Sequence, residues 1–203
     1  AAAARAAKAE GADALVLDDG LQNPTLEKDF SLIVVDGAYG FGNGRLVPAG
    51  PLREPIEAGL KRAQAVVLVG EDRAGIENAL VGRLPLLRGR LEPEEPLEAL
   101  AGRPLFAFAG IGRPEKFFGM LRGAGLTLAG TRSFADHHPY RREEVEALLK
   151  EAAPLEAVPV TTAKDAVRLP AELRTRVQVV PVRFRFEETE AFEALLRPVL
   201  SGA

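Results

Sequence analysis

Short continuous runs of hydrophobic residues recur along the chain, and between several of them hydrophobic residues return at helical spacing. Such runs are typical of strands that are buried on both faces, and strands that alternate with helices build parallel sheets. The predicted strands are Ala12–Leu17, Ser31–Val35, Ala65–Val69, Leu105–Ala109, Leu126–Ser133, Ala157–Thr161 and Val177–Phe186. The predicted helices are Ala1–Glu10, Pro55–Arg62, Pro114–Arg122, Tyr140–Ala152, a short one from Ala163 and a closing one from Thr189. The pattern therefore predicts an α/β fold.

A stretch rich in proline and glutamate, "LEPEEPLEALAGRP", interrupts this alternation near residues 92–103. We interpret it as a domain junction and predict two Rossmann-like α/β/α lobes with mainly parallel sheets. Residues 1–95 would be the remainder of an N-terminal lobe, and residues 96–203 a C-terminal lobe. Because the alanine-rich opening runs directly into a predicted buried strand, we expect the first lobe to be incomplete at its N-terminus.

Composition narrows the class of protein. Of 203 residues, 47% are hydrophobic and 27% are charged, which is the balance of a globular protein with a real core. The net charge is -3, so the chain lacks the excess of basic residues that is typical of a nucleic-acid-binding protein. The chain has no cysteine, which excludes disulfides and thiolate metal sites. No apolar run approaches the ~18 residues that cross a bilayer, so we expect no membrane span in this sequence.

Carboxylates follow the first two predicted strands, at Asp18, Asp19 and Asp36. Ligands of open parallel sheets bind at the carboxyl ends of the strands, where a carboxylate can hold Mg²⁺ or act on an attacking hydroxyl. The alternative is that Asp18 and Asp19 start a turn or cap a helix, as aspartate often does.

The segment 37–55 contains five glycines and three prolines, so it is predicted to be a stiff, irregular loop. Arg45 and Arg53 could bind a phosphate or carboxylate, which arginine does in a bidentate manner. Glu54 could instead pair with one of these arginines. The loop matches neither the P-loop motif nor a G-x-G-x-x-G motif that opens a helix.

Both histidines are adjacent, in "DHHPY". A histidine beside an aspartate can act as a base, because the carboxylate fixes the tautomer and stabilises the imidazolium. Asp136 and His137 could otherwise cap the following helix, whose first turn would contain Pro139. A metal site of His137, His138 and a carboxylate is a further, less favourable alternative, since adjacent ligands bind awkwardly.

Two other motifs have mainly structural interpretations. In "VTTAKDAVRLP", Thr162 and Asp165 have the spacing of a helix-capping pair, and Lys164 could face a cleft between the lobes. In "FAGIGRPEKFF", Gly110 and Gly112 suit a tight turn before a helix, whose N-terminus could bind an anion.

Five blocks of the sequence together resemble the signature motifs of the tetraacyldisaccharide 4′-kinase family, the lipid A 4′-kinases. The blocks are "LDDGLQN", "VVDG…GFGNGRLVPAGPLREP", "FAGIGRPEKFF", "FADHHPY" and "VTTAKDAVRL". The resemblance implies two Rossmann-like lobes and transfer of the γ-phosphate of ATP to the 4′-hydroxyl of a tetraacylated glucosamine disaccharide 1-phosphate. It also implies a cytoplasmic enzyme that contacts the cytoplasmic face of the inner membrane peripherally.

The resemblance also implies roles for individual residues. Asp18 matches the catalytic aspartate and Asp19 a ligand of Mg²⁺, while His137 matches the histidine that partners Asp18 and has Asp136 beside it. The loop from Gly42 to Glu54 resembles the segment that lines the substrate cleft. Its candidate cofactor-binding residues are Asn43, Arg45, Arg53 and Glu54.

The sequence departs from the family pattern at Asn23, Tyr39 and Ala163, where many members have histidine, arginine and glutamate. The phosphate-binding loop and hydrophobic helix of the family would precede Ala1. We therefore expect the intact protein to be a kinase and this 203-residue chain alone to be inactive or nearly so.

Two other functions fit the same residues. A metal-dependent phosphohydrolase could use the three aspartates and the histidine pair, and it would release phosphate without a nucleotide. A non-catalytic fragment could bind the glycolipid without binding a nucleotide. The sequence alone leaves the oligomeric state open.

Overall fold

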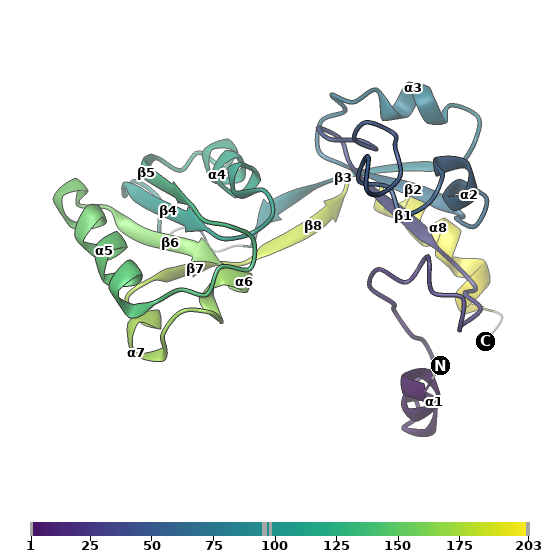
Figure 1. Ribbon diagram of the computed structural model, residues 1–203, viewed down its shortest axis with the longest axis horizontal. Coiled ribbons are helices and arrows are strands. Elements are labelled where there is room, and N and C mark those ends of the chain that lie inside the picture. The colour runs from purple at the N-terminus through teal and green to yellow at the C-terminus, as the bar shows by residue number, and fades with distance from the viewer. Residues whose placement is uncertain (1, 95–96, 98, 202–203) are drawn as a thin grey trace. The chain divides into compact units, whose positions relative to one another are not determined.

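The computed structural model describes residues 2–94, 97 and 99–201, and the chain in it divides into two compact units (Figure 1). Unit 1 comprises Ala1–Arg90 and Arg185–Ala203, and unit 2 comprises Leu91–Phe184. The chain enters unit 2 within β3 (Leu86–Pro93) and returns to unit 1 within β8 (Val182–Phe186). Each unit is described by itself below.

This division differs from the predicted lobes, 1–95 and 96–203, because the C-terminal segment belongs to unit 1. The predicted strand Val177–Phe186 is in fact two strands in two sheets. β7 (Gln178–Val180) pairs with a strand of unit 2, whereas β8 joins β3 through a bond such as Glu187 N to Arg88 O, 2.9 Å long. Pro181 lies between the two strands and is the local mark of this break, since proline cannot donate a backbone hydrogen bond within a sheet.

Unit 1 has a four-stranded sheet of order β1-β2-β3-β8, in which β1, β2 and β3 are parallel. Helices on this sheet shield Val66 and Leu68, which form a core with Leu60 and Leu80. The other elements of unit 1 are α1 (Ala2–Ala9), β1 (Leu32–Asp36), α2 (Ile56–Leu60), β2 (Ala65–Val69), α3 (Ile76–Leu80) and α8 (Thr189–Leu200).

Unit 2 has a second four-stranded sheet, of order β5-β4-β6-β7, with parallel pairing throughout. Its elements before β7 are β4 (Leu105–Ala109), α4 (Pro114–Gly123), β5 (Leu128–Ser133), α5 (Arg142–Ala152), a 3₁₀ turn (Ala153–Leu155), β6 (Val158–Thr162), α6 (Ala163–Ala166) and α7 (Ala171–Arg174). Strands and helices therefore alternate as the sequence predicts.

The central strand β4 is buried on both faces, which explains its uninterrupted hydrophobic run. Leu105 and Ala107 pack in one core with Phe118 of α4, while Phe106 and Phe108 pack in another with side chains of α5 and α7. Alternate residues of a strand point to opposite faces, so the two cores lie on the two sides of the sheet (Figure 1). Unit 2 is thus a three-layer α/β/α sandwich.

The predicted strand Ala12–Leu17 is wrong. This segment has no regular secondary structure, and its side chains are exposed, with Val16 at 98%. A parallel strand needs a neighbouring strand to satisfy its backbone groups, and no described strand pairs with this one. Asp18 consequently does not end a strand, whereas Asp36 does end β1.

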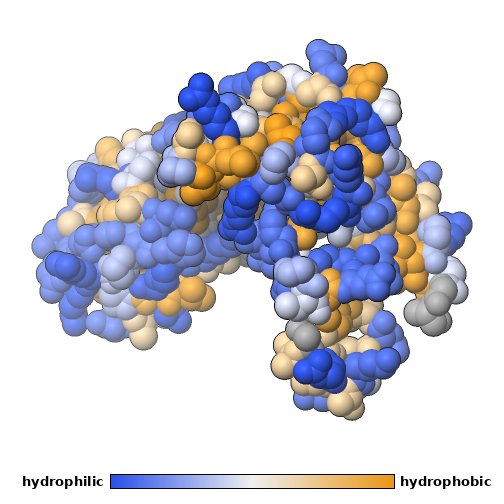
Figure 2. All heavy atoms as spheres, turned by 45° about the vertical axis from the view of Figure 1, so that its right-hand side comes forward, coloured by the Kyte–Doolittle hydropathy of each residue, from blue (hydrophilic) through white to orange (hydrophobic). Residues whose placement is uncertain are grey.

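The predicted fold class is confirmed: the chain is α/β, with mostly parallel sheets. Hydrophobic side chains reach the surface at several places on the face shown in Figure 2, and the exposed ones of unit 1 include Leu15, Val16 and Val34. Among the described helices, none is both long enough and apolar enough to cross a bilayer.

Candidate functional site

The Asp18–Asp19 pair forms an exposed turn in unit 1. Asp19 has a φ of 52°, a left-handed conformation that is costly for a residue other than glycine. Its carboxylate accepts a hydrogen bond from Arg53 Nη1 at 2.7 Å, and both side chains are more than half exposed. The structure thus brings together two predicted site residues, the proposed Mg²⁺ ligand and an arginine of the glycine- and proline-rich loop.

A second contact joins the same two segments. Gln22 Nε2 donates to Glu54 Oε1 at 2.9 Å, and Arg62 Nη2 donates to the same oxygen at 2.5 Å. The bond from Gln22 is the main cause of the lowered pKa of Glu54. The bond from Arg62 also lowers this pKa, while burial opposes both effects. Glu54 therefore pairs with Arg62 rather than with Arg45 or Arg53, and its carboxylate holds the turn against the loop.

Asn43 has a structural role in the loop. Its Nδ2 donates to Ala49 O at 2.8 Å, and its Oδ1 accepts from Arg45 N at 3.1 Å. A Cβ added at Gly50 would lie 2.1 Å from that Oδ1, so the loop closes tightly here. Because its amide is engaged, Asn43 shapes the loop, while the exposed Arg45 side chain has no ion pair with any described residue.

Asp36 follows the pattern of a turn-forming aspartate. Its Oδ1 accepts from Ala38 N at 3.0 Å, just beyond the end of β1. Within the part of the chain that the structure describes, no group of three histidine, cysteine, aspartate or glutamate side chains is arranged to hold a metal ion.

In unit 2, His137 lies in a strained, exposed turn. Its φ is 57°, and its side chain is 87% exposed. Its backbone N–H is shared between Gly110 O and Asp136 Oδ1, each 3.0 Å away. The ring Nε2 lies 3.8 Å from Asp136 Oδ2, so the two side chains are neighbours but are too far apart for a hydrogen bond, and their catalytic role stays a prediction. The backbone of this turn is held by hydrogen bonds, while the imidazole is exposed.

The neighbouring His138 is structural. Its ring stacks on Phe134 with centroids 4.7 Å apart, and a ring nitrogen lies 3.2 Å from a carboxylate oxygen of Glu144. Glu144 also accepts from Arg141 N at 2.8 Å, and this bond is the main cause of its lowered pKa. The helix that follows begins at Arg142, so Pro139 lies before it and Asp136 is not its cap. The alternative of helix capping is wrong for Asp136 and His137.

Asp165 is more than a helix cap. The predicted capping bond exists, from Asp165 N to Thr162 Oγ1 at 3.1 Å, but the carboxylate itself is completely buried. It accepts from Gly110 N and from Tyr140 Oη, both at 3.0 Å. Three of the sequence blocks therefore meet at one side chain. The sequence carries no separate signal for these contacts, because helix capping already accounted for Asp165.

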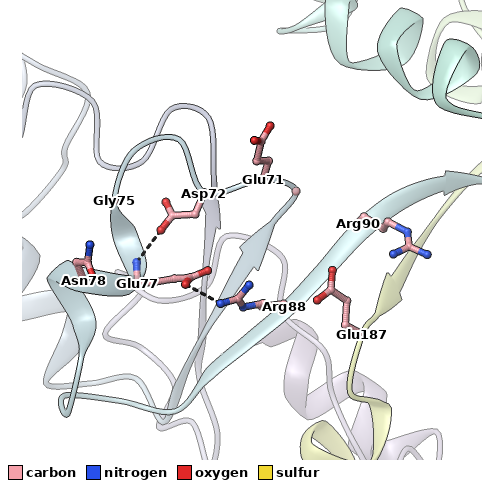
Figure 3. A pocket seen from close by; sticks show the side chains of 9 residues that line it. Glu71, Asp72, Gly75, Glu77, Asn78, Arg88, Arg90 and Glu187 are labelled. Atoms are coloured by element: carbon pink, nitrogen blue, oxygen red, sulfur yellow. Dashed lines mark hydrogen bonds and ion pairs between the residues drawn. The ribbon is translucent and has the colours of Figure 1, made fainter.

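A separate open pocket of about 610 Å³ lies in unit 1 near the end of β2 (Figure 3). It is charged, but two of its charges pair with each other: Arg88 Nη2 lies 2.6 Å from Glu77 Oε2. Asp72 accepts from the first backbone N–H groups of α3, and the bond from Glu77 N is the main cause of its lowered pKa. Since none of the predicted site residues lines this pocket, we assign it no catalytic role.

Comparison with known proteins explains the order of the blocks. The family model for tetraacyldisaccharide-1-P 4′-kinase matches residues 1–201. The chain belongs to this family. Members of the kinase family similar to it include the tetraacyldisaccharide 4′-kinases of Rhodospirillum centenum, 58% identical over 203 residues, and of Rhodospirillum rubrum, 55% identical over 200 residues. These alignments cover 100% and 97% of the chain, and 60% of each relative.

A solved structure of the family is also similar. The crystal structure of an "apo" form of LpxK from Aquifex aeolicus in complex with ATP matches with a TM-score of 0.62 and 25% identity. The match covers 89% of this chain and 56% of the Aquifex chain. The chain thus spans about 60% of the length of its curated relatives. Asp18 and His137 lie in different units, so their facing one another across a crevice stays a prediction.

Proposed function

We propose that the intact protein transfers the γ-phosphate of ATP to the 4′-hydroxyl of a tetraacylated glucosamine disaccharide 1-phosphate in lipid A biosynthesis. The observation that carries the proposal is the family match over residues 1–201. The exposed His137 imidazole beside Asp136 adds to it, because phosphoryl transfer to a sugar needs a group that takes the hydroxyl proton.

The two units would contribute different groups. The Asp18–His137 pair, with Asp136 beside the histidine, would form the base that accepts the proton of the sugar hydroxyl. Arg53 and Arg45 are the cations that would meet the phosphates of ATP, and arginine suits this task through its fork of donors. Closing of the two lobes would assemble the base at the substrate.

The residues of the turn fit a Mg²⁺ ion. Mg²⁺ in kinases is held by one or two carboxylates and by substrate phosphates, and Asp19 would supply one such carboxylate. The 2.7 Å bond from Arg53 to Asp19 already places a cation at this carboxylate. When bound, Mg²⁺ would neutralise phosphate charge, while Arg53 could then turn to the phosphates.

The lipid substrate determines where the enzyme would work. Its acyl chains lie in a bilayer, so we propose that the intact protein is cytoplasmic and contacts the cytoplasmic face of the inner membrane peripherally. The phosphorylated sugar end of the substrate would then reach the site from the membrane surface.

Phosphate transfer from labelled ATP to the disaccharide 1-phosphate tests the proposal. We expect transfer by the protein expressed from its complete coding sequence, and little or none by the 203-residue chain alone. Robust turnover by the short chain would contradict the second expectation. Release of phosphate in a metal-dependent reaction without nucleotide, and no labelled lipid, would replace the kinase with a phosphohydrolase.

A further inference from the structure

We propose that the buried Asp165 carboxylate is a positioning residue that fixes the His137 turn from both sides. The inference rests on the proposed role of His137 as the base. Asp165 does not touch the reacting atoms in this account; it acts through the backbone of Gly110 and the side chain of Tyr140.

The first connection runs through Gly110. Gly110 N donates to Asp165 Oδ1 at 3.0 Å, and Gly110 O accepts from His137 N at 3.0 Å. Arg168 Nη1 donates to the same carbonyl at 3.1 Å, and Arg168 Nη2 lies 3.3 Å from Asp165 Oδ1. Asp165 therefore binds the N–H of Gly110 and Arg168 binds its C=O. The same C=O accepts the hydrogen bond from the backbone N–H of His137.

The second connection runs through Tyr140, three residues after His137. Its hydroxyl donates to Asp165 Oδ1 at 3.0 Å, and burial together with the nearby Asp165 charge raises its pKa, so it stays a donor. The turn also packs directly on Gly110: an added Cβ would lie 3.0 Å from both His138 Cβ and Tyr140 Oη. The Asp165 carboxylate thus holds both Gly110, on which the turn packs, and Tyr140, at the end of the turn.

This arrangement matters because the conformation of His137 is costly. A left-handed residue other than glycine persists only where its surroundings fix it, and such residues concentrate at functional sites. A buried carboxylate is likewise retained only when it is well paired, which here involves Thr162 Oγ1 at 2.7 Å as well. Together these features favour a role in placing His137 over a role in general stability.

Thr161 provides a matched control. It is completely buried on the same strand as Thr162, and its Oγ1 donates to Phe108 O at 2.8 Å. No described contact joins its side chain to Gly110 or to the His137 turn. Thr161→Val therefore removes a buried hydrogen bond from unit 2 without loosening the turn.

The test is a double-mutant cycle in the kinase expressed from its complete coding sequence, with phosphate transfer as the readout. We expect Asp165→Asn to lower kcat by roughly 10- to 100-fold, with little change in KM for ATP, because a displaced catalytic group costs about that much. In the His137→Ala background, Asp165→Asn should cause no further loss. Thr161→Val should have the same effect in both backgrounds.

An equal loss from Asp165→Asn in both backgrounds would overturn the inference, because Asp165 would then act independently of His137. Wild-type kcat in His137→Ala would instead remove His137 from the reaction, and the proposed base would fail first. If Asp165→Asn does not fold, Tyr140→Phe keeps the carboxylate and removes one donor. The cycle with Tyr140→Phe should show a smaller loss that also disappears in the His137→Ala background, and a loss that persists there would overturn the inference.

Discussion

Backbone strain marks two of the proposed site residues. Among the residues that the structure describes, left-handed conformations outside glycine occur at Asp19, His137 and Glu156. Each such residue costs roughly 1–3 kcal/mol unless its surroundings compensate. At Asp19 the compensation includes the bond from Arg53, and at His137 it includes the bond to Gly110. Asp19 in unit 1 and His137 in unit 2 are thus both strained, and both are residues that the family resemblance selects.

The adjacent aspartates can be separated by a Mg²⁺ titration. Asp19→Asn should raise the Mg²⁺ concentration for half-maximal phosphate transfer by at least about tenfold, because it weakens a metal ligand. Asp13→Asn, which removes an exposed charge from the same segment, should leave that concentration unchanged. An unchanged Mg²⁺ requirement in Asp19→Asn would contradict its assignment as the ligand. If Asp18→Asn alone raised the requirement, the ligand and the partner of His137 would have to exchange roles.

At the level of elements, the sequence predicts what local pattern determines. The hydrophobic run Ala65–Val69 is a strand with those bounds, and the predicted helix Pro114–Arg122 extends only to Gly123. Pattern fails where pairing decides the outcome. Ala12–Leu17 has the composition of a buried strand but no partner among the described strands, and β3 has too many charged residues to read as a buried strand.

The candidate site shows the same limit. Residue type and motif selected Asp19, Arg53 and His137, but they could not reveal that the first two touch or that His138 is structural. Asp165 was assigned only to helix capping, since its contacts to Gly110 and Tyr140 span sequence separations of 55 and 25 residues. Such contacts arise from packing of the sheet, which no local pattern records.

The glycine- and proline-rich loop should tolerate no side chain at Gly50. A Cβ there would lie 2.4 Å from Arg45 O as well as against Asn43, so we expect Gly50→Ala to lower the free energy of unfolding by ~1–3 kcal/mol. A Cβ at Gly119, in α4, would meet no described atom within 4 Å apart from its chain neighbours and the backbone of its own helix. Gly119→Ala should therefore raise the free energy of unfolding by about 0.5–1 kcal/mol. Urea titration of the two variants checks this, and effects of the same sign would contradict the loop geometry.

The Glu54 contact should make stability depend on pH. The fold lowers the pKa of Glu54, so its contribution is present above the pKa of the unfolded chain, near 4.5, and is lost as pH falls through the folded value. We expect Glu54→Gln to lower the free energy of unfolding by about 1 kcal/mol at pH 7, and the difference to shrink below roughly pH 4. Glu10→Gln, at an exposed position, serves as the control. A difference that grows in acid would contradict the lowered pKa.

At the scale of the whole molecule, the chain passes between its two units within strands rather than through a loose linker. Unit 1 contains the Asp18–Asp19 turn and the loop with Arg53, and unit 2 contains His137 on a turn that is connected to Asp165 through Gly110. In the proposed mechanism, unit 1 supplies the Mg²⁺ ligand, Asp18 and the arginines, and unit 2 supplies His137. The proposed activity therefore depends on both units, and on cooperation between side chains that belong to different ones.

The most direct test of that cooperation is the kcat of phosphate transfer in Asp18→Asn, His137→Ala and the double variant, each expressed from the complete coding sequence. We expect each single change to lower kcat by roughly 10²–10⁴-fold, and the double variant to be no slower than the slower single one, because the two groups act as a unit. Losses that multiply in the double variant, or wild-type turnover in either single one, would contradict a centre built from both.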